Sequence, residues 1–346
     1  MRTKTLSVIL SLVSLVTFGQ RVVTVHGASG VQAFHSSDPF QDAYAAAVDG
    51  DTIYLPGGNM SVPAMFDKSL LIYGAGYHPD STQATMKSTL SGLVSLREDA
   101  SNSHFEGIEF LGNVITPTDE AISYISFKRC YFNGNVTYWA SPSIQAANNN
   151  SFMECVFKSY VQMRSSANSS FHNCIFQDHV RYSYGNYFAN NIFLMNSTST
   201  TNNVFRNSDY NTIQNNVFLS LGNNIISTSS TLSCTGNMVY NNLFVAENPV
   251  FGFDPISGGN YTNINHNDVF INQTGYIFDF EHDYNLQAPT TYIGNDGDEV
   301  GVYGGIFPFK AGGIPLNPHI QAKNIANQTN NNGELEIEIQ VEAQND

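Results

Sequence analysis

The chain has 346 residues, of which 42% are hydrophobic and only 12% are charged, about half the charged fraction of an ordinary globular protein. Its 24 Phe and 18 Tyr supply material for a large core, which excludes a charge-rich disordered chain. With 14 Lys and Arg against 29 Asp and Glu, the net charge is −15. This balance argues against nucleic-acid binding, because phosphate contacts need clustered Lys and Arg.

Residues 1–19 have the composition of a secretory signal peptide. The bases Arg2 and Lys4 precede an apolar run over 6–18, and Gly19 is a small residue of the kind found at a cleavage site. The apolar run has about 13 residues, whereas a membrane-spanning helix needs about 20. The sequence therefore predicts secretion, to the medium or the cell surface, and a mature chain without a transmembrane segment.

The segment that follows the leader predicts a short helix and then a strand. Asp38 precedes a Pro and an amphipathic stretch, which is the order typical of a helix N-terminus. Gly50-Asp51 predicts a turn, and the apolar residues after it predict a first strand.

One six-residue phrase recurs through the middle of the chain. It begins and ends with an apolar residue, usually Phe, and contains Cys or Asn between them. Most closing Phe residues follow one another at the length of one solenoid coil, and the two short intervals on either side of Phe205 predict an extra turn within one coil. The clear copies are 127–132, 152–157, 171–176, 188–193, 213–218 and 239–244, and the weaker ones are 105–110, 200–205 and 265–270.

The phrase is typical of a tight turn between two short strands. Asn suits such a turn because it tolerates a left-handed backbone, and its amide can hydrogen-bond to the coils above and below. The Phe of the next strand points inward. Stacked coils therefore predict parallel ladders of Phe and of Asn, and no part of 100–285 has a sustained helical period.

The cysteines follow the same repeat. Cys130, Cys155 and Cys174 occupy one position of the phrase, and Cys234 is the fourth. Two disulfides are the alternative in a secreted protein. However, stacked positions hold parallel side chains about 4.8 Å apart, whereas disulfide Cβ atoms converge to about 3.8 Å. The sequence predicts buried free thiols, with no metal-binding spacing among them.

The phrase resembles the coils of right-handed parallel β-helix proteins, the pectate-lyase-like superfamily, over roughly residues 30–305. The segment 38–58 is similar to the start of such proteins, where a short helix covers the open end of the solenoid. The resemblance implies an all-β, right-handed parallel β-helix solenoid at 20–305 with an N-terminal capping helix. The segments 301–305 and 315–320 are similar to the closing segment of many secreted bacterial β-helix proteins, which implies a C-terminal extension at 306–346.

The last part of the chain predicts a C-terminal hairpin cap. Residues 332–343 alternate apolar and acidic side chains with the period of a half-buried strand, and they can pair with 318–326 across an Asn-rich loop. A secretion or docking signal is the alternative. Capping is favoured because an acidic outer face also keeps an exposed strand edge from aggregating.

Charged and aromatic residues recur at similar distances from the Phe ladder. Arg164 lies seven residues after the closing Phe157, and Arg181 lies five residues after the closing Phe176. Aromatic rings that stack on sugars, beside Arg that bonds hydroxyls or carboxylates, are typical of a carbohydrate-binding surface. Ordinary surface turns are the alternative. The candidate carbohydrate-binding residues are Trp139, Tyr160, Arg164, Asp178, His179, Arg181, Tyr182 and Tyr184.

A second candidate site lies in residues 276–283. Strand alternation there would place Asp279, Glu281 and Asp283 on one face. Three aligned carboxylates could bind Ca²⁺, the one cofactor that the residues suggest, or hold an acid and base pair. A solvated acidic face is the alternative.

These observations favour an extracellular β-helix that acts as a non-catalytic surface or carbohydrate-binding scaffold, with an extracellular polysaccharide as its partner. The first alternative is a polysaccharide lyase or glycoside hydrolase, for which acids in the central coils are too sparse to assign a catalytic pair. The second is a purely structural rod.

Overall fold

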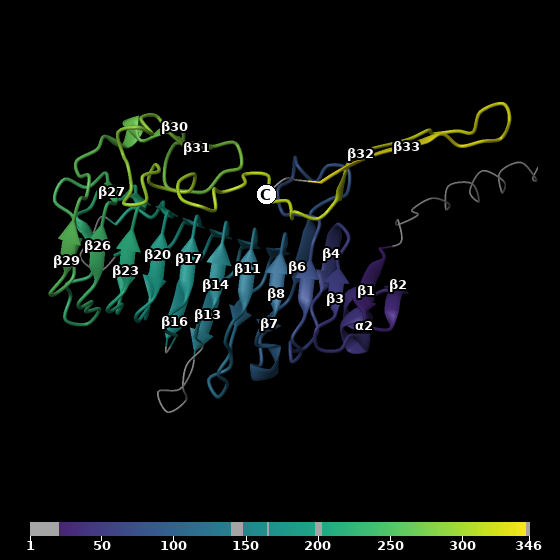
Figure 1. Ribbon diagram of the computed structural model, residues 1–346, viewed down its shortest axis with the longest axis horizontal. Coiled ribbons are helices and arrows are strands. Elements are labelled where there is room, and N and C mark those ends of the chain that lie inside the picture. The colour runs from purple at the N-terminus through teal and green to yellow at the C-terminus, as the bar shows by residue number, and fades with distance from the viewer. Residues whose placement is uncertain (1–20, 140–147, 165, 198–202, 344–346) are drawn as a thin grey trace, which may run out of the picture.

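The computed structural model describes residues 21–139, 148–164, 166–197 and 203–343, which form a parallel β-helix (Figure 1). Each central coil adds one short strand to each of three sheets, which we call sheets 1, 2 and 3 in the order that the chain visits them. They contain 12, nine and eight strands. The predicted all-β solenoid is confirmed.

Sheet 1 is parallel except at its N-terminal edge, where β1 pairs antiparallel with both β2 and β3. Its strands are β2 (Gly30–Phe34), β1 (Val23–Gly27), β3 (Thr52–Tyr54), β5 (Leu71–Tyr73), β8 (His104–Glu106), β11 (Ser126–Lys128), β14 (Ser151–Met153), β17 (Ser170–His172), β20 (Tyr187–Ala189), β23 (Thr212–Gln214), β26 (Met238–Tyr240) and β29 (Ile256–Gly258).

Sheets 2 and 3 are parallel throughout. Sheet 2 contains β4 (Gly58–Ser61), β6 (Ser88–Ser91), β9 (Glu109–Phe110), β12 (Tyr131–Phe132), β15 (Val156–Phe157), β18 (Ile175–Phe176), β21 (Ile192–Phe193), β24 (Val217–Phe218) and β27 (Leu243–Phe244). Sheet 3 contains β7 (Val94–Ser95), β10 (Val114–Ile115), β13 (Val136–Trp139), β16 (Val161–Arg164), β19 (Val180–Arg181), β22 (Phe205–Arg206), β25 (Asn224–Ile226) and β28 (Val250–Phe251). A 3₁₀ turn, η1 (Glu98–Ala100), follows β7.

Two Phe ladders fill the interior. One runs along sheet 1, where Phe152 and Phe171 stack with ring centroids 4.7 Å apart. The other contains the closing Phe residues of sheet 2, and it continues from Phe193 directly to Phe218 at 4.6 Å. Phe205 lies at the ordinary sheet 3 position of that coil, opposite Val180, so the two short intervals divide one coil at a regular strand rather than at the predicted extra turn.

The closing ladder ends one copy earlier than the sequence predicts. Phe270 belongs to β30 (Phe270–Asn272), which pairs antiparallel with β31 (Asp283–Leu286) and adds no strand to the coils. The phrase at 265–270 instead forms a 3₁₀ turn, η2 (His266–Asp268). Its similarity to the repeat is therefore local and does not extend the solenoid.

Asn was expected both to make the turn and to form the ladder, and in the structure each of the two central positions of the phrase does one of these. The first position has a left-handed backbone, with φ of 56° at Asn190 and 58° at Asn215. The second position forms the ladder, in which the Asn216 amide donates to Asn242 Oδ1 at 2.9 Å and accepts from Asn191 at 2.9 Å. In earlier coils Cys takes this second position. All four cysteines are buried and free, as predicted.

The helix α2 (Pro39–Ala46) covers the N-terminal end of the solenoid. Its Phe40 is fully buried and packs against Phe66, with ring centroids 6.2 Å apart. The Asp38 side chain makes no capping hydrogen bond, contrary to expectation, and Pro39 begins the helix.

The last strand of the coils is β29, and one parallel bridge from Leu243 to Tyr261 follows it; the chain then turns back, well before residue 305. Residues 261–316, which we call the return segment, run along the outer face of sheet 2 (Figure 1). The residue before each closing Phe, such as Val156 or Ile192, points outward there, and the return segment buries it against Val300 and Val302. This apolar stripe explains why sheet 2 is covered on both faces.

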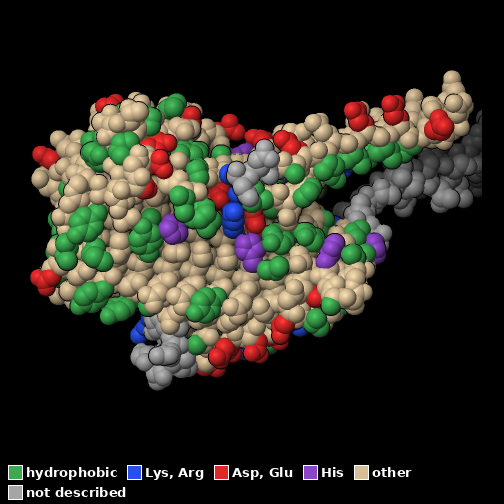
Figure 2. Space-filling model, in the orientation of Figure 1, with side chains coloured by type: hydrophobic (Ala, Val, Ile, Leu, Met, Phe, Trp, Pro, Cys, Tyr) green, Lys and Arg blue, Asp and Glu red, His purple; other side chains and the backbone are tan. Residues whose placement is uncertain are grey.

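The predicted C-terminal hairpin is present. β32 (His319–Ile325) pairs antiparallel with β33 (Ile337–Glu342), and Ile325 lies opposite Ile337. The hairpin extends away from the coils, with glutamates on one side and hydrophobic side chains on the other (Figures 1 and 2). Its apolar side remains open, because Ile337 and Ile339 are 55% and 51% exposed.

Candidate functional site

The candidate carbohydrate-binding residues lie on the outer face of sheet 3. Strand alternation buries Val161 and Met163 in the core and turns Arg164 outward. The register then places Arg181 beside Gln162 and places Arg206 beside Arg181 in the next coil. Arginines from three successive coils therefore share one surface.

Each of two arginines lies over an aromatic ring. The Arg181 guanidinium carbon is 3.8 Å from the centre of the Tyr160 ring. The Arg164 carbon is 4.5 Å from the Trp139 ring and 5.6 Å from the Tyr182 ring. These distances lie within the range of cation–π attraction. We call this surface the arginine face; its residues are Trp139, Tyr160, Arg164, Asp178, His179, Arg181, Tyr182 and Arg206.

Asp178 and His179 form a pair at the centre of this surface. His179 Nδ1 lies 2.7 Å from Asp178 Oδ1, and its ring stacks on Tyr160. Burial alone would raise the pKa of the Asp178 carboxyl, but the hydrogen bonds and charge of His179, with the charge of Arg206, lower that pKa below its ordinary value. Asp178 therefore stays ionised and orients the imidazole.

Several buried polar atoms of this surface lack hydrogen-bond partners within the described residues. They are Arg181 Nε, His179 Nε2 and both amide atoms of Gln162, whose side chain is almost fully buried. Native proteins satisfy most such atoms, and ordered water commonly does so where protein groups do not.

The sequence-based prediction of the arginine face included one residue that lies outside it and omitted one that belongs to it. Tyr184 is 54% exposed and packs against Tyr210, with ring centroids 5.5 Å apart, rather than over an arginine. Arg206 is part of the face but was not predicted, because Phe205 resembles a closing Phe of sheet 2, whereas it lies in sheet 3 opposite Val180. The signal was present in the Phe-Arg dipeptide, which matches Val180-Arg181 once that coil is aligned.

The second candidate site does not form. Asp279 and Glu281 lie in turns, and β31 begins only at Asp283, so no strand aligns the three carboxylates. The Asp279 carboxylate accepts from the Glu281 backbone at 2.9 Å, and the Asp283 carboxylate accepts from Asn285. Within the described ranges, no group of three His, Cys, Asp or Glu side chains could hold a metal ion. The predicted strand, and with it the Ca²⁺ site, is wrong.

Comparisons with known proteins give no family assignment. A scan of protein-family models, a search of curated proteins and a search of solved structures each found no match to this chain. The resemblance to other β-helix proteins therefore depends on the repeated phrase and on the parallel coils. No helix in the described part of the chain is long and apolar enough to cross a membrane, and the predicted leader, 1–19, lies outside that part.

Proposed function

We propose that this protein is secreted and binds acidic polysaccharides through the arginine face, without cleaving them. The single observation that supports this proposal most is the stacking of Arg164 and Arg181 on aromatic rings. The resemblance to the pectate-lyase-like superfamily adds an analogy of fold to this argument and identifies no reaction.

A stacked guanidinium is well suited to carboxylate recognition. Its face lies against the ring, so its N–H donors point outward in the plane of the group and can bind a carboxylate in bidentate fashion. The ring also limits the rotamers of the arginine, which lowers the entropy that binding costs. Arg164 and Arg181 are thus oriented before the ligand arrives.

The periodicity of the coils matches a repeating ligand. Neighbouring strands in a sheet lie about 4.8 Å apart, and Arg181 and Arg206 are direct neighbours across such a step. A polymer with a carboxylate on each sugar unit can engage several of these positions at once. Multiple weak contacts then add up to useful affinity.

The composition of the face favours binding over hydrolysis. Glycoside hydrolysis generally uses two carboxylates, whereas the arginine face as defined contains one, Asp178, which is already bonded to His179. The proposal is therefore a binding protein.

A glycan panel tests this proposal. The purified protein is titrated with polygalacturonate and with neutral dextran, and the solutions are assayed for new reducing and unsaturated ends. We expect saturable binding of polygalacturonate only, with no products. An Arg164→Gln/Arg181→Gln variant should bind at least about tenfold more weakly, because each lost charged hydrogen bond costs about 1.5–3 kcal/mol.

Lys128→Gln is the matched control, because it removes a positive charge from the outer face of sheet 1 and leaves the arginine face intact. It should bind like the wild type. Equal affinity in the double arginine variant, or no binding to any acidic glycan, would overturn the proposed site. Product formation that the double variant abolishes would show an enzyme instead.

A further inference from the structure

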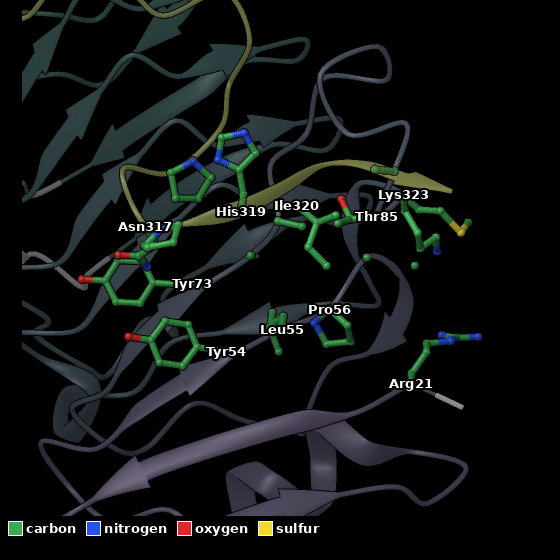
Figure 3. A pocket seen from close by; sticks show the side chains of 18 of the residues that line it. Arg21, Tyr54, Leu55, Pro56, Tyr73, Thr85, Asn317, His319, Ile320 and Lys323 are labelled. Atoms are coloured by element: carbon green, nitrogen blue, oxygen red, sulfur yellow. The ribbon is translucent and has the colours of Figure 1, made fainter. Parts of the chain in front are cut away.

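A large cavity lies at the first coils of the solenoid, away from the arginine face. It has a volume of about 1030 Å³ and lies between the first coils and the start of the C-terminal hairpin. β3 and β5 supply one wall, residues 84–86 a second, and residues 315–323 a third (Figure 3). Segments almost 300 residues apart in the sequence thus meet around it.

The charge of this cavity is opposite to that of the molecule. Its lining includes Arg21, Lys323 and His319 but no Asp or Glu, although acids outnumber bases 29 to 14 in the whole chain. Neither Arg21 nor Lys323 forms an ion pair with any other described residue. A site whose described lining holds two cations and no acid is complementary to an anion.

The middle of the cavity is apolar. Pro56 and Ile320 face one another there, between the cationic end at Arg21 and a polar aromatic end (Figure 3). At that aromatic end Tyr54 and Tyr73 stack with ring centroids 5.6 Å apart. Met86, which also lines the cavity, is 66% exposed and can close over an apolar ligand.

We propose that this cavity is a second binding site, for an amphiphilic organic anion. The carboxylate or sulfonate of the ligand pairs with Arg21 and Lys323, and its apolar body lies against Pro56, Met86 and Ile320. A volume of about 1030 Å³ is at the upper end of ordinary small-molecule sites. The site is independent of the arginine face, so either one can exist without the other.

A matched pair of fluorescent probes tests the proposal. Anilinonaphthalene sulfonate and the uncharged N-phenylnaphthylamine share an aromatic body, and only the first is an anion. We expect one sulfonate probe to bind per chain, at least about tenfold more tightly than the uncharged probe. Dodecanoate should displace it, whereas acetate, which has the charge without the apolar body, should not.

Variants of the two cations locate the site. Arg21→Gln/Lys323→Gln should weaken sulfonate binding about tenfold while leaving the uncharged probe within about twofold. Ile320→Ser should weaken both probes, because it removes apolar contact. Lys158→Gln, a matched loss of charge outside the cavity lining, should change neither. Equal affinities of the two probes for the wild type, or wild-type sulfonate binding by the double variant, would overturn the proposal.

Discussion

At the scale of single residues, the fold depends on one phrase whose positions have separate tasks. The inward Phe fills the core, and the left-handed residue makes the turn. The Asn or Cys after it satisfies the backbone of the coil below, as when Asn216 Nδ2 donates to the Phe188 carbonyl at 3.0 Å. Cys130 Sγ makes the equivalent contact to the Phe105 carbonyl at 3.5 Å, so Cys fills the same position in the earlier coils. Burial in this role raises the pKa of the Cys130 thiol, so it is a poor nucleophile.

Phe218→Ala tests the inward ladder. Phe218 is 1% exposed and stacks between Phe193 and Phe244, at 4.6 and 4.7 Å. Its removal should lower the free energy of unfolding by about 3–5 kcal/mol, through lost burial and the cavity left behind. Chemical denaturation measures this value. Phe253→Ala, at a 44% exposed position, should cost far less, and equal losses in the two variants would contradict the ladder.

The inward Phe ladder could be predicted from the sequence because every central coil repeats the same six-residue phrase. Phe127 and Phe152 occupy equivalent positions of the phrase, and they stack as expected at 5.2 Å. The same argument failed where the repeat ends. Apolar and acidic residues alternate over 276–283 with the period of a strand, but no neighbouring coil is available to pair with them, so Asp279 and Glu281 lie in turns.

At the scale of elements, the return segment is held by the side chains of successive left-handed turns. Asn173 donates to the carbonyls of Val302 and Gly304 at 2.9 and 2.8 Å. Two coils earlier, Arg129 donates to the Ile314 carbonyl at 3.1 Å. In each of these two coils, one residue therefore both turns the chain and fastens the segment that crosses above it.

A buried ion cluster lies under the end of this segment. Arg129 is 2% exposed and bonds Glu154 at 3.0 Å and Glu106 at 3.4 Å. Arg129→Met would leave Glu154 buried without its cation and Glu106 with His104 alone, which should cost about 3–5 kcal/mol. It should also speed amide hydrogen exchange near Ile314. Arg97→Met is the control, because its ion pair with Glu120 is partly exposed and should be worth about 0–1 kcal/mol.

The same cluster predicts a loss of stability in acid. Burial alone would raise the pKa of Glu106, but the hydrogen bond and charge of His104, with the charge of Arg129, lower it below its ordinary value of 4.5. A carboxyl whose pKa is lowered by folding stabilises the folded state. This stabilisation is fully present above the unfolded-state pKa and is lost as the pH falls through the folded-state pKa. Glu106→Gln should therefore be less stable at pH 7 and show a flatter decline below about pH 4.5. The free energy of unfolding is measured by denaturation at several pH values. If it declines as steeply in the variant as in the wild type, Glu106 is not the source of the acid sensitivity.

At the scale of the whole molecule, the arginine face is a local exception in an acidic protein. The net charge of −15 repels a polyanion at long range, whereas Arg164 and Arg181 attract it at contact. The Debye length falls from about 30 Å at 0.01 M salt to about 8 Å at 0.15 M. Affinity for polygalacturonate should therefore pass through a maximum at intermediate salt. A steady loss of affinity from the lowest salt upward would show that the net charge of the protein does not repel polygalacturonate measurably.

Sequence predicted less at this scale, because distant segments meet without any shared pattern. The apolar residues before each closing Phe, such as Val156 and Ile192, pack against the return segment, but their pattern alone predicted no cover for sheet 2. Nothing in the repeat indicated that residues 261–316 are the cover. The cavity between Tyr54 and Ile320 was equally beyond sequence reasoning, since only the fold brings these residues together.

The most direct test of the proposed function is a hydrogen-exchange comparison of the protein free and saturated with polygalacturonate. We predict slower exchange in β13, β16, β19 and β22, the strands of the arginine face, with β3, β5 and β32 unchanged. Protection confined to those last three strands, or no protection anywhere, would contradict the assignment of polysaccharide binding to sheet 3.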